Sequence, residues 1–147
     1  MELKDVLGAT GEASAQRFSL YLPDKDRDGA TVPRHEDWVE AAMTIFADVN
    51  GGATRLPTAK GIWKPETGDV VREATSVVYS FIRDTGAFEA GLDRLARFIH
   101  TVGKHANQGE VMVDFAGEVP AGAGGELRFV SRAYFIDEYP KAGAPPF

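Results

Sequence analysis

Glu73 is the residue whose type and position in this chain are best suited to acid–base chemistry. It lies in the stretch 70–83, where apolar residues on both faces predict a central strand. If its face of that strand is the core face, partial desolvation raises the pKa of the carboxyl group toward that of a general base. A competing interpretation, which the sequence favours, places Glu73 near the strand end, in solvent or paired with Arg72 or Arg55.

Aromatic residues could line a ligand pocket next to Glu73. Trp63 lies on the preceding expected strand, across the turn 65–69, and Tyr79 shares the face of Glu73 on its own strand. A pocket with Trp, Tyr and Glu side chains suits a small ligand that is flat or positively charged. Tyr21, on the first expected strand, is a further candidate for ligand binding.

The chain has three histidines, and His100 is the second candidate for a general base. His100 and His105 are five residues apart on one expected helix, which separates them by about 140° around its axis. A shared metal ion prefers a spacing of four residues. A partly buried, hydrogen-bonded histidine is therefore the favoured interpretation of His100. The sequence predicts no metal site and no cofactor.

The segment 24–29 matches the first half of a calcium-binding loop, D-x-D-x-D-G. The twelfth position of such a loop needs a bidentate carboxylate, but His35 occupies it here. The segment also follows an expected strand, whereas a calcium-binding loop of this type follows a helix. The sequence predicts an Asp- and Gly-rich surface turn instead.

Composition limits the classes of function. The 147 residues carry 16 basic and 22 acidic side chains, a net charge of −6, which opposes binding to nucleic acids or to anionic membranes. There are no cysteines, so disulfides and thiolate sites are excluded. Residues 1–16 contain no apolar region after a basic one, so we expect no signal peptide, and no apolar run approaches the ~20 residues that span a bilayer. We therefore expect a cytoplasmic protein without a membrane partner.

The apolar spacing predicts an alternation of strands and helices within one domain. Strands are expected at 17–22, 53–64, 70–83 and 110–115, helices at 33–49 and 88–106, and residues 127–136 could add an edge strand. This order predicts the α+β class: a ferredoxin-like βαββαβ plait, whose antiparallel four-stranded sheet has both helices on one face. We expect a lead-in at 1–16, a single plait domain at 17–136 and a tail at 137–147.

Several short segments carry a resemblance to known proteins. The matching segments are RFSLYLP at Arg17, DRDG at Asp26, GGAT at Gly51, GIW at Gly61, and Glu73 shortly before VVYSF. Over roughly residues 17–115 the chain resembles a group of small uncharacterised bacterial plait proteins, and the resemblance implies a fold without an activity. More distantly it is similar to dimeric α+β barrel proteins. Those proteins pair two plaits through their sheets and often enclose a small ligand.

These patterns lead to two main hypotheses for function. The favoured one is a small-ligand or protein-binding module that forms a homodimer through its sheet. The sheet face without helices carries apolar residues, and a second copy would shield them from water. If residues 127–136 fold over that face, the chain could remain a monomer. The alternative is a small cofactor-independent enzyme of the α+β barrel kind, in which Glu73 or His100 is the general base and Tyr79 and Trp63 shape the pocket.

A nucleic-acid module is the third hypothesis, since the plait is also the topology of RNA-recognition motifs. Tyr21, Tyr79 and Phe81 could then stack on bases. The strand at 70–83 lacks the basic-Gly-aromatic opening of that motif, however, and the net charge is unfavourable. The sequence therefore predicts no nucleic-acid partner.

Overall fold

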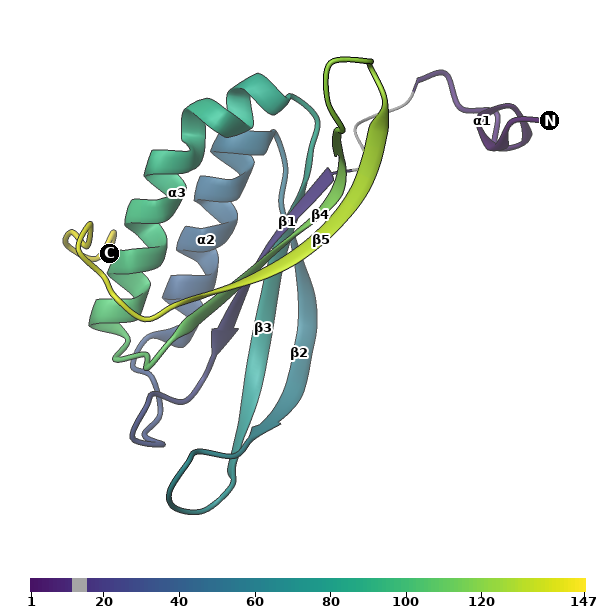
Figure 1. Cartoon of the computed structure of the whole chain (residues 1–147). Helices are drawn as coiled ribbons and strands as arrows, with labels where there is room; N and C mark the ends of the chain where they lie inside the picture. The colour runs from purple at the N-terminus through teal and green to yellow at the C-terminus, as the bar shows by residue number, and fades with distance from the viewer. Residues whose placement is uncertain (12–15) are drawn as a thin grey trace.

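The computed structural model describes residues 1–11 and 16–147. Residues 12–15, which belong to the expected lead-in, lie outside the described residues. The elements, drawn in Figure 1, are α1 (Leu3–Val6), β1 (Gln16–Pro23), α2 (His35–Asn50), β2 (Thr54–Trp63), β3 (Val71–Ile82), α3 (Thr85–His105), β4 (Val111–Pro120) and β5 (Leu127–Ile136).

The strands form one sheet in the order β2-β3-β1-β4-β5, and the neighbours are antiparallel. The expected α+β class is confirmed, and the arrangement is broadly ferredoxin-like. The expected sheet of four strands is too small, because β4 continues to Pro120 and pairs along its whole length with β5. The segment that could add an edge strand, residues 127–136, is this fifth strand.

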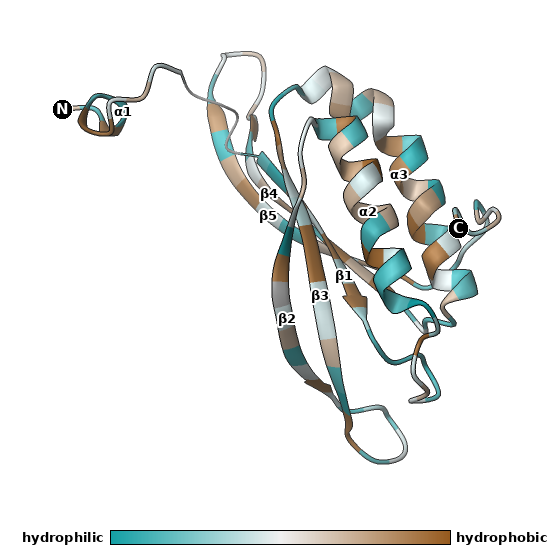
Figure 2. Ribbon diagram, turned by 180° about the vertical axis from the view of Figure 1, so that it is seen from behind, coloured by the Kyte–Doolittle hydropathy of each residue, from teal (hydrophilic) through white to brown (hydrophobic). Residues whose placement is uncertain are grey.

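Helices α2 and α3 cover one face of the sheet, and the other face carries no helix (Figures 1 and 2). Alternate side chains of β1 fill the space under the helices, where Leu20 of β1 and Phe46 of α2 are fully buried. The same alternation in β3 points Val78 and Ile82 into this core. Glu73 and Tyr79 therefore lie on the opposite side, which we call the open face.

Two local signals in the sequence agree with the structure. Pro57 favours an edge strand or a bulge, and β2 is an edge strand whose register shifts between Leu56 and Ala59. Gly51 ends α2 in the left-handed region, at a φ of 86°, and its N–H donates to the carbonyl of Ala47. No helix among residues 1–11 and 16–147 is long and apolar enough to cross a membrane. The cytoplasmic location stays a prediction.

The two helices approach each other closely at Gly91 of α3. A Cβ atom at this position would lie 2.6 Å from Cγ1 of Val49. We expect Gly91→Ala to lower the free energy of unfolding by about 1 kcal/mol, because the overlap costs more than the gain in helix propensity. Urea denaturation measures the change. Adding Val49→Ala should restore the lost stability, and a Gly91→Ala protein more stable than the wild type would contradict this packing.

Candidate functional site

A groove of about 670 Å³ lies on the open face, at the end of the sheet where β3 begins and β1 ends. Its rim includes the turn after β1, at 25–27, the segment 108–110 before β4, and residues 64–66 after β2. The strand residues that line it come from all five strands and include Tyr21, Trp63, Glu73, Thr75, Met112 and Phe135. This volume is in the range that holds a small molecule.

Among these strand residues Glu73 is the acidic one, and it is half-buried. Its strand partner on β2 is Gly61, and Oε1 of Glu73 lies 3.8 Å from the point where a Cβ of Gly61 would be. The carboxylate therefore leans over a position without a side chain. Burial raises the pKa of Glu73 above its usual value of 4.5, the charge of Asp24 adds to this, and a hydrogen bond with Trp63 acts in the opposite direction.

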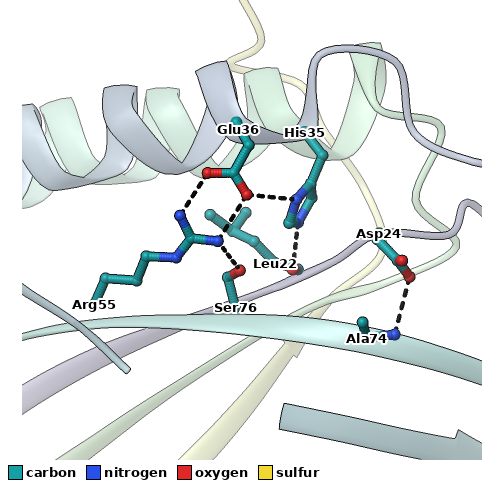
Figure 3. A network of polar contacts seen from close by, with 7 residues as sticks. All are labelled: Leu22, Asp24, His35, Glu36, Arg55, Ala74 and Ser76. Atoms are coloured by element: carbon teal, nitrogen blue, oxygen red, sulfur yellow. Dashed lines mark hydrogen bonds and ion pairs between the residues drawn. The ribbon is translucent and has the colours of Figure 1, made fainter. Parts of the chain in front are cut away.

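The position of Asp24 follows from its role at the end of β1. Its Oδ1 accepts a 2.9 Å hydrogen bond from the backbone N–H of Ala74 (Figure 3), which keeps its charge next to the strand that carries Glu73. The segment 24–29 is a turn, in which Oδ1 of Asp26 accepts hydrogen bonds from the N–H groups of Asp28 and Ala30. Within the described part of the chain, no three histidine or acidic side chains are grouped to hold a metal ion.

Arg55 does not pair with Glu73. It lies on the helix side of the sheet, where Nη2 donates to Glu36 Oε1 at 2.7 Å and to Ser76 Oγ at 2.9 Å (Figure 3). His35 stands beside this pair, with Nε2 2.8 Å from the carbonyl oxygen of Leu22. The bulge in β2 explains the placement, because an extra residue turns the side chains before it to the other face.

Tyr21 joins the groove to a carboxylate that sequence reasoning missed. Its hydroxyl donates a 2.6 Å hydrogen bond to Oδ2 of Asp114 on β4, which together with burial raises the pKa of Tyr21 to about 12. The other carboxylate oxygen, Oδ1, is buried and has no hydrogen-bond partner among the described residues. No signal in the sequence identified Asp114, because the register between β1 and β4 decides which residues meet.

Tyr79 lies outside the groove. It is six residues beyond Glu73 on the same strand, a separation of roughly 20 Å. Its ring packs edge-on against Phe81, with the centroids 5.7 Å apart, and the guanidinium carbon of Arg17 lies 5.5 Å from its centroid. The structure thus brings Glu73, Trp63 and Tyr21 together and leaves Tyr79 at the other end of the open face.

His100 lies on α3, in the helix layer, and is also outside the groove. Its Nδ1 accepts a 3.1 Å hydrogen bond from the backbone N–H of Lys141, and its ring lies edge-on to Tyr139. Burial, assisted by the charge of Lys141, lowers the pKa of His100 below its usual value. The C-terminal segment 137–147 therefore packs on the helices, and His100 cannot act together with Glu73.

Comparisons with known proteins support the fold. No protein-family model and no curated protein matches the chain. Among solved structures, it is similar to a phage SAM lyase in complex with S-methyl-5′-thioadenosine, with a TM-score of 0.53 and 13% identity over 86% of this chain and 92% of that one. The apo state of a phage SAM lyase gives a TM-score of 0.45 and 18% identity, covering 84% of this chain and 90% of that chain. At such identity the likeness shows the α+β fold alone, and no bacterial group is shown.

Proposed function

We propose that the groove binds a small organic cation that carries a flat ring. The observation that carries the proposal is a half-buried carboxylate, that of Glu73, which lies beside the indole of Trp63 inside a groove of about 670 Å³. A carboxylate that is partly removed from water gains more from a cationic partner than an exposed one does. An indole face attracts cations and stacks on flat rings.

Tyr21 also favours a ligand that donates hydrogen bonds. Its own proton points to Asp114, so its oxygen offers lone pairs to the groove. At the rim, both signs of charge occur: Lys25 and Arg27 lie there with Asp26 and Glu110. A ligand with a cationic centre near Glu73 and a zwitterionic group near the rim would satisfy these charges.

S-Adenosylmethionine is the first ligand to test, because it combines a sulfonium cation, an adenine ring and an amino-acid zwitterion. One solved structure with a similar fold is that of a phage SAM lyase in complex with S-methyl-5′-thioadenosine. The best control is S-adenosylhomocysteine, which keeps the ring and the amino acid but lacks the sulfonium charge. In calorimetric titrations we expect the sulfonium compound to bind at least about tenfold more tightly, a difference of about 1.4 kcal/mol. Equal affinity, or no binding of either compound, would overturn the proposal.

Binding should depend on pH through Glu73. The raised pKa means that protonation of the carboxyl group begins at a higher pH than in an ordinary glutamate. Because the cation needs the ionised form, its affinity should fall as the pH drops from 7 toward and below 4.5, by up to about tenfold per pH unit. Titrations across this range measure the effect. A Glu73→Gln protein should show a flat profile, and an equally steep one would exclude Glu73 as the titrating group.

A cofactor-independent enzyme that works in the same groove is the second candidate. The raised pKa of Glu73 favours it, since a general base is most effective when its pKa lies near the working pH. Incubation with S-adenosylmethionine, followed by chromatography for S-methyl-5′-thioadenosine, tests this candidate. Release of that product by the wild type but not by Glu73→Gln would establish an enzyme, whereas binding without release leaves a binding module.

We further propose that the chain forms a homodimer through its open face, as the sequence led us to expect. Large apolar side chains remain exposed there, with Phe81 at 53% and Phe129 at 67%. Large apolar side chains that are exposed on one face favour a protein partner. Acidic residues such as Glu73, Asp114 and Glu118 are distributed over the same face, which opposes a nucleic-acid partner. We also propose, from the short sequence segments alone, that the chain is related to the group of bacterial plait proteins.

A further inference from the structure

One end of the open face carries an apolar area that is separate from the groove. We call it the aromatic patch and define it as Tyr79, Phe81, Leu127 and Phe129. Phe81, Leu127 and Phe129 are 53%, 62% and 67% exposed. Across the sheet, Arg17 of β1 and Ala116 of β4 lie between Phe81 of β3 and Ser131 of β5. The patch therefore consists of exposed apolar side chains on β3 and β5, with Arg17 and Ala116 between them.

The N-terminal helix α1 has a matching surface. Leu3, Val6 and Leu7 are spaced i, i+3 and i+4, so they form one apolar stripe. They are 71%, 61% and 69% exposed, and no residue of α1 is buried. The helix lies away from the sheet and from α2 and α3 (Figures 1 and 2). An amphipathic helix of this length is not stable by its own hydrogen bonds and needs a packing partner.

We propose that α1 of one copy packs on the aromatic patch of a second copy, and that the exchange is reciprocal. The inference rests on the proposed homodimer through the open face. Residues 8–15 join α1 to Gln16, which pairs with Ile82 next to the patch. Eight residues span at most about 29 Å, which is enough to reach a second chain that faces the sheet. In a two-fold dimer, the same contact covers both patches.

Charge favours the same arrangement. Glu2 and Asp5 accompany the apolar stripe in the N-terminal segment, and Arg17 lies across from Phe81 with its guanidinium near Tyr79. An arriving α1 could therefore place a carboxylate near this arginine while its apolar stripe covers the aromatic rings. The second copy is the occupant we infer because α1 extends away from its own sheet (Figure 1).

Sedimentation velocity at micromolar concentration tests the exchange. We expect a mass of two chains for the wild type, and at least about a tenfold higher dissociation constant for Val6→Asp/Leu7→Asp and for Phe129→Asp. Leu92→Asp is the matched control, since Leu92 is an exposed leucine of α3 far from the patch, 43% exposed, and should leave the dimer unchanged. Far-UV circular dichroism verifies that each variant is folded.

Cross-linking identifies the chain that α1 contacts. Because the natural sequence has no cysteine, only the introduced cysteines can form a disulfide. A mixture of Val6→Cys and Phe129→Cys proteins should form a disulfide-linked pair of chains on oxidation. A one-chain mass for the wild type would overturn both the homodimer and the exchange. Two other results would overturn the exchange but leave the homodimer intact. One is a dimer that remains stable after the Val6→Asp/Leu7→Asp change. The other is a disulfide that forms within a single chain carrying both Val6→Cys and Phe129→Cys, but not between chains in the mixture. Ligand binding by the groove is measured independently of all these outcomes.

Discussion

Replacement of Glu73 by glutamine is expected to weaken the binding of S-adenosylmethionine at least about thirtyfold, a loss of about 2 kcal/mol. Glutamine has nearly the same shape, so the contacts with Trp63 and the space over Gly61 remain. The change removes the negative charge that the sulfonium centre needs. Isothermal titration calorimetry at pH 7 measures the effect.

The matched control is Glu89→Gln, which removes an exposed carboxylate on α3, on the other side of the sheet. It should bind the ligand as the wild type does. Glu73→Gln should also be no less stable than the wild type at pH 7. Because the pKa of Glu73 is raised by folding, ionisation costs stability as the pH rises through the unfolded value, and glutamine removes this cost. Equal losses in both variants would mean that only the overall charge matters.

Replacement of Tyr21 by phenylalanine is expected to lower the free energy of unfolding by about 2 kcal/mol. The hydroxyl is the donor to Oδ2 of Asp114, and Oδ1 already lacks a partner, so the variant leaves a half-buried carboxylate without a hydrogen bond. Chemical denaturation at pH 7 measures the loss. At this pH the contribution is fully present, because a raised tyrosine pKa costs stability only as the pH rises from about 10 toward about 12.

Asp114→Asn provides the comparison for Tyr21→Phe. The amide oxygen still accepts the phenol proton, so this variant should lose less stability than Tyr21→Phe. It should also bring the pKa of Tyr21 down from about 12 toward its usual value, which ultraviolet absorbance detects during an alkaline titration. If Tyr21→Phe is as stable as the wild type, the hydrogen bond adds nothing and the groove wall at Tyr21 is held by packing alone.

Much of the fold could be predicted because the apolar spacing is regular. The period of two in β1 and the apolar stripes of α2 and α3 are local properties, and they place these elements within a few residues of their observed bounds. The extent of β4 was harder to predict. Its second half, toward Pro120, is stabilised by pairing with β5, so its strand character depends on a partner that is distant in the chain.

The candidate site was only partly predictable, for three physical reasons. Side chains that share a strand face can still be far apart, so Tyr79 and Glu73 do not meet although they point the same way. The bulge in β2 reverses which side chains face the groove, so Trp63 reaches it and Arg55 does not. Whether a strand face is covered depends on the helices, and for this reason the sequence left open whether Glu73 lies in the core.

The pKa of Glu73 itself, measured by NMR from the chemical shift of its labelled carboxyl carbon, tests the proposed role of the groove most directly. We expect a value above 4.5 in the free protein, a clear decrease on saturation with S-adenosylmethionine, and a smaller change with S-adenosylhomocysteine. Such a result would mean that the carboxylate is partly desolvated and that a cation binds next to it. An ordinary pKa that neither compound changes would contradict the proposal that this groove recognises a small cation.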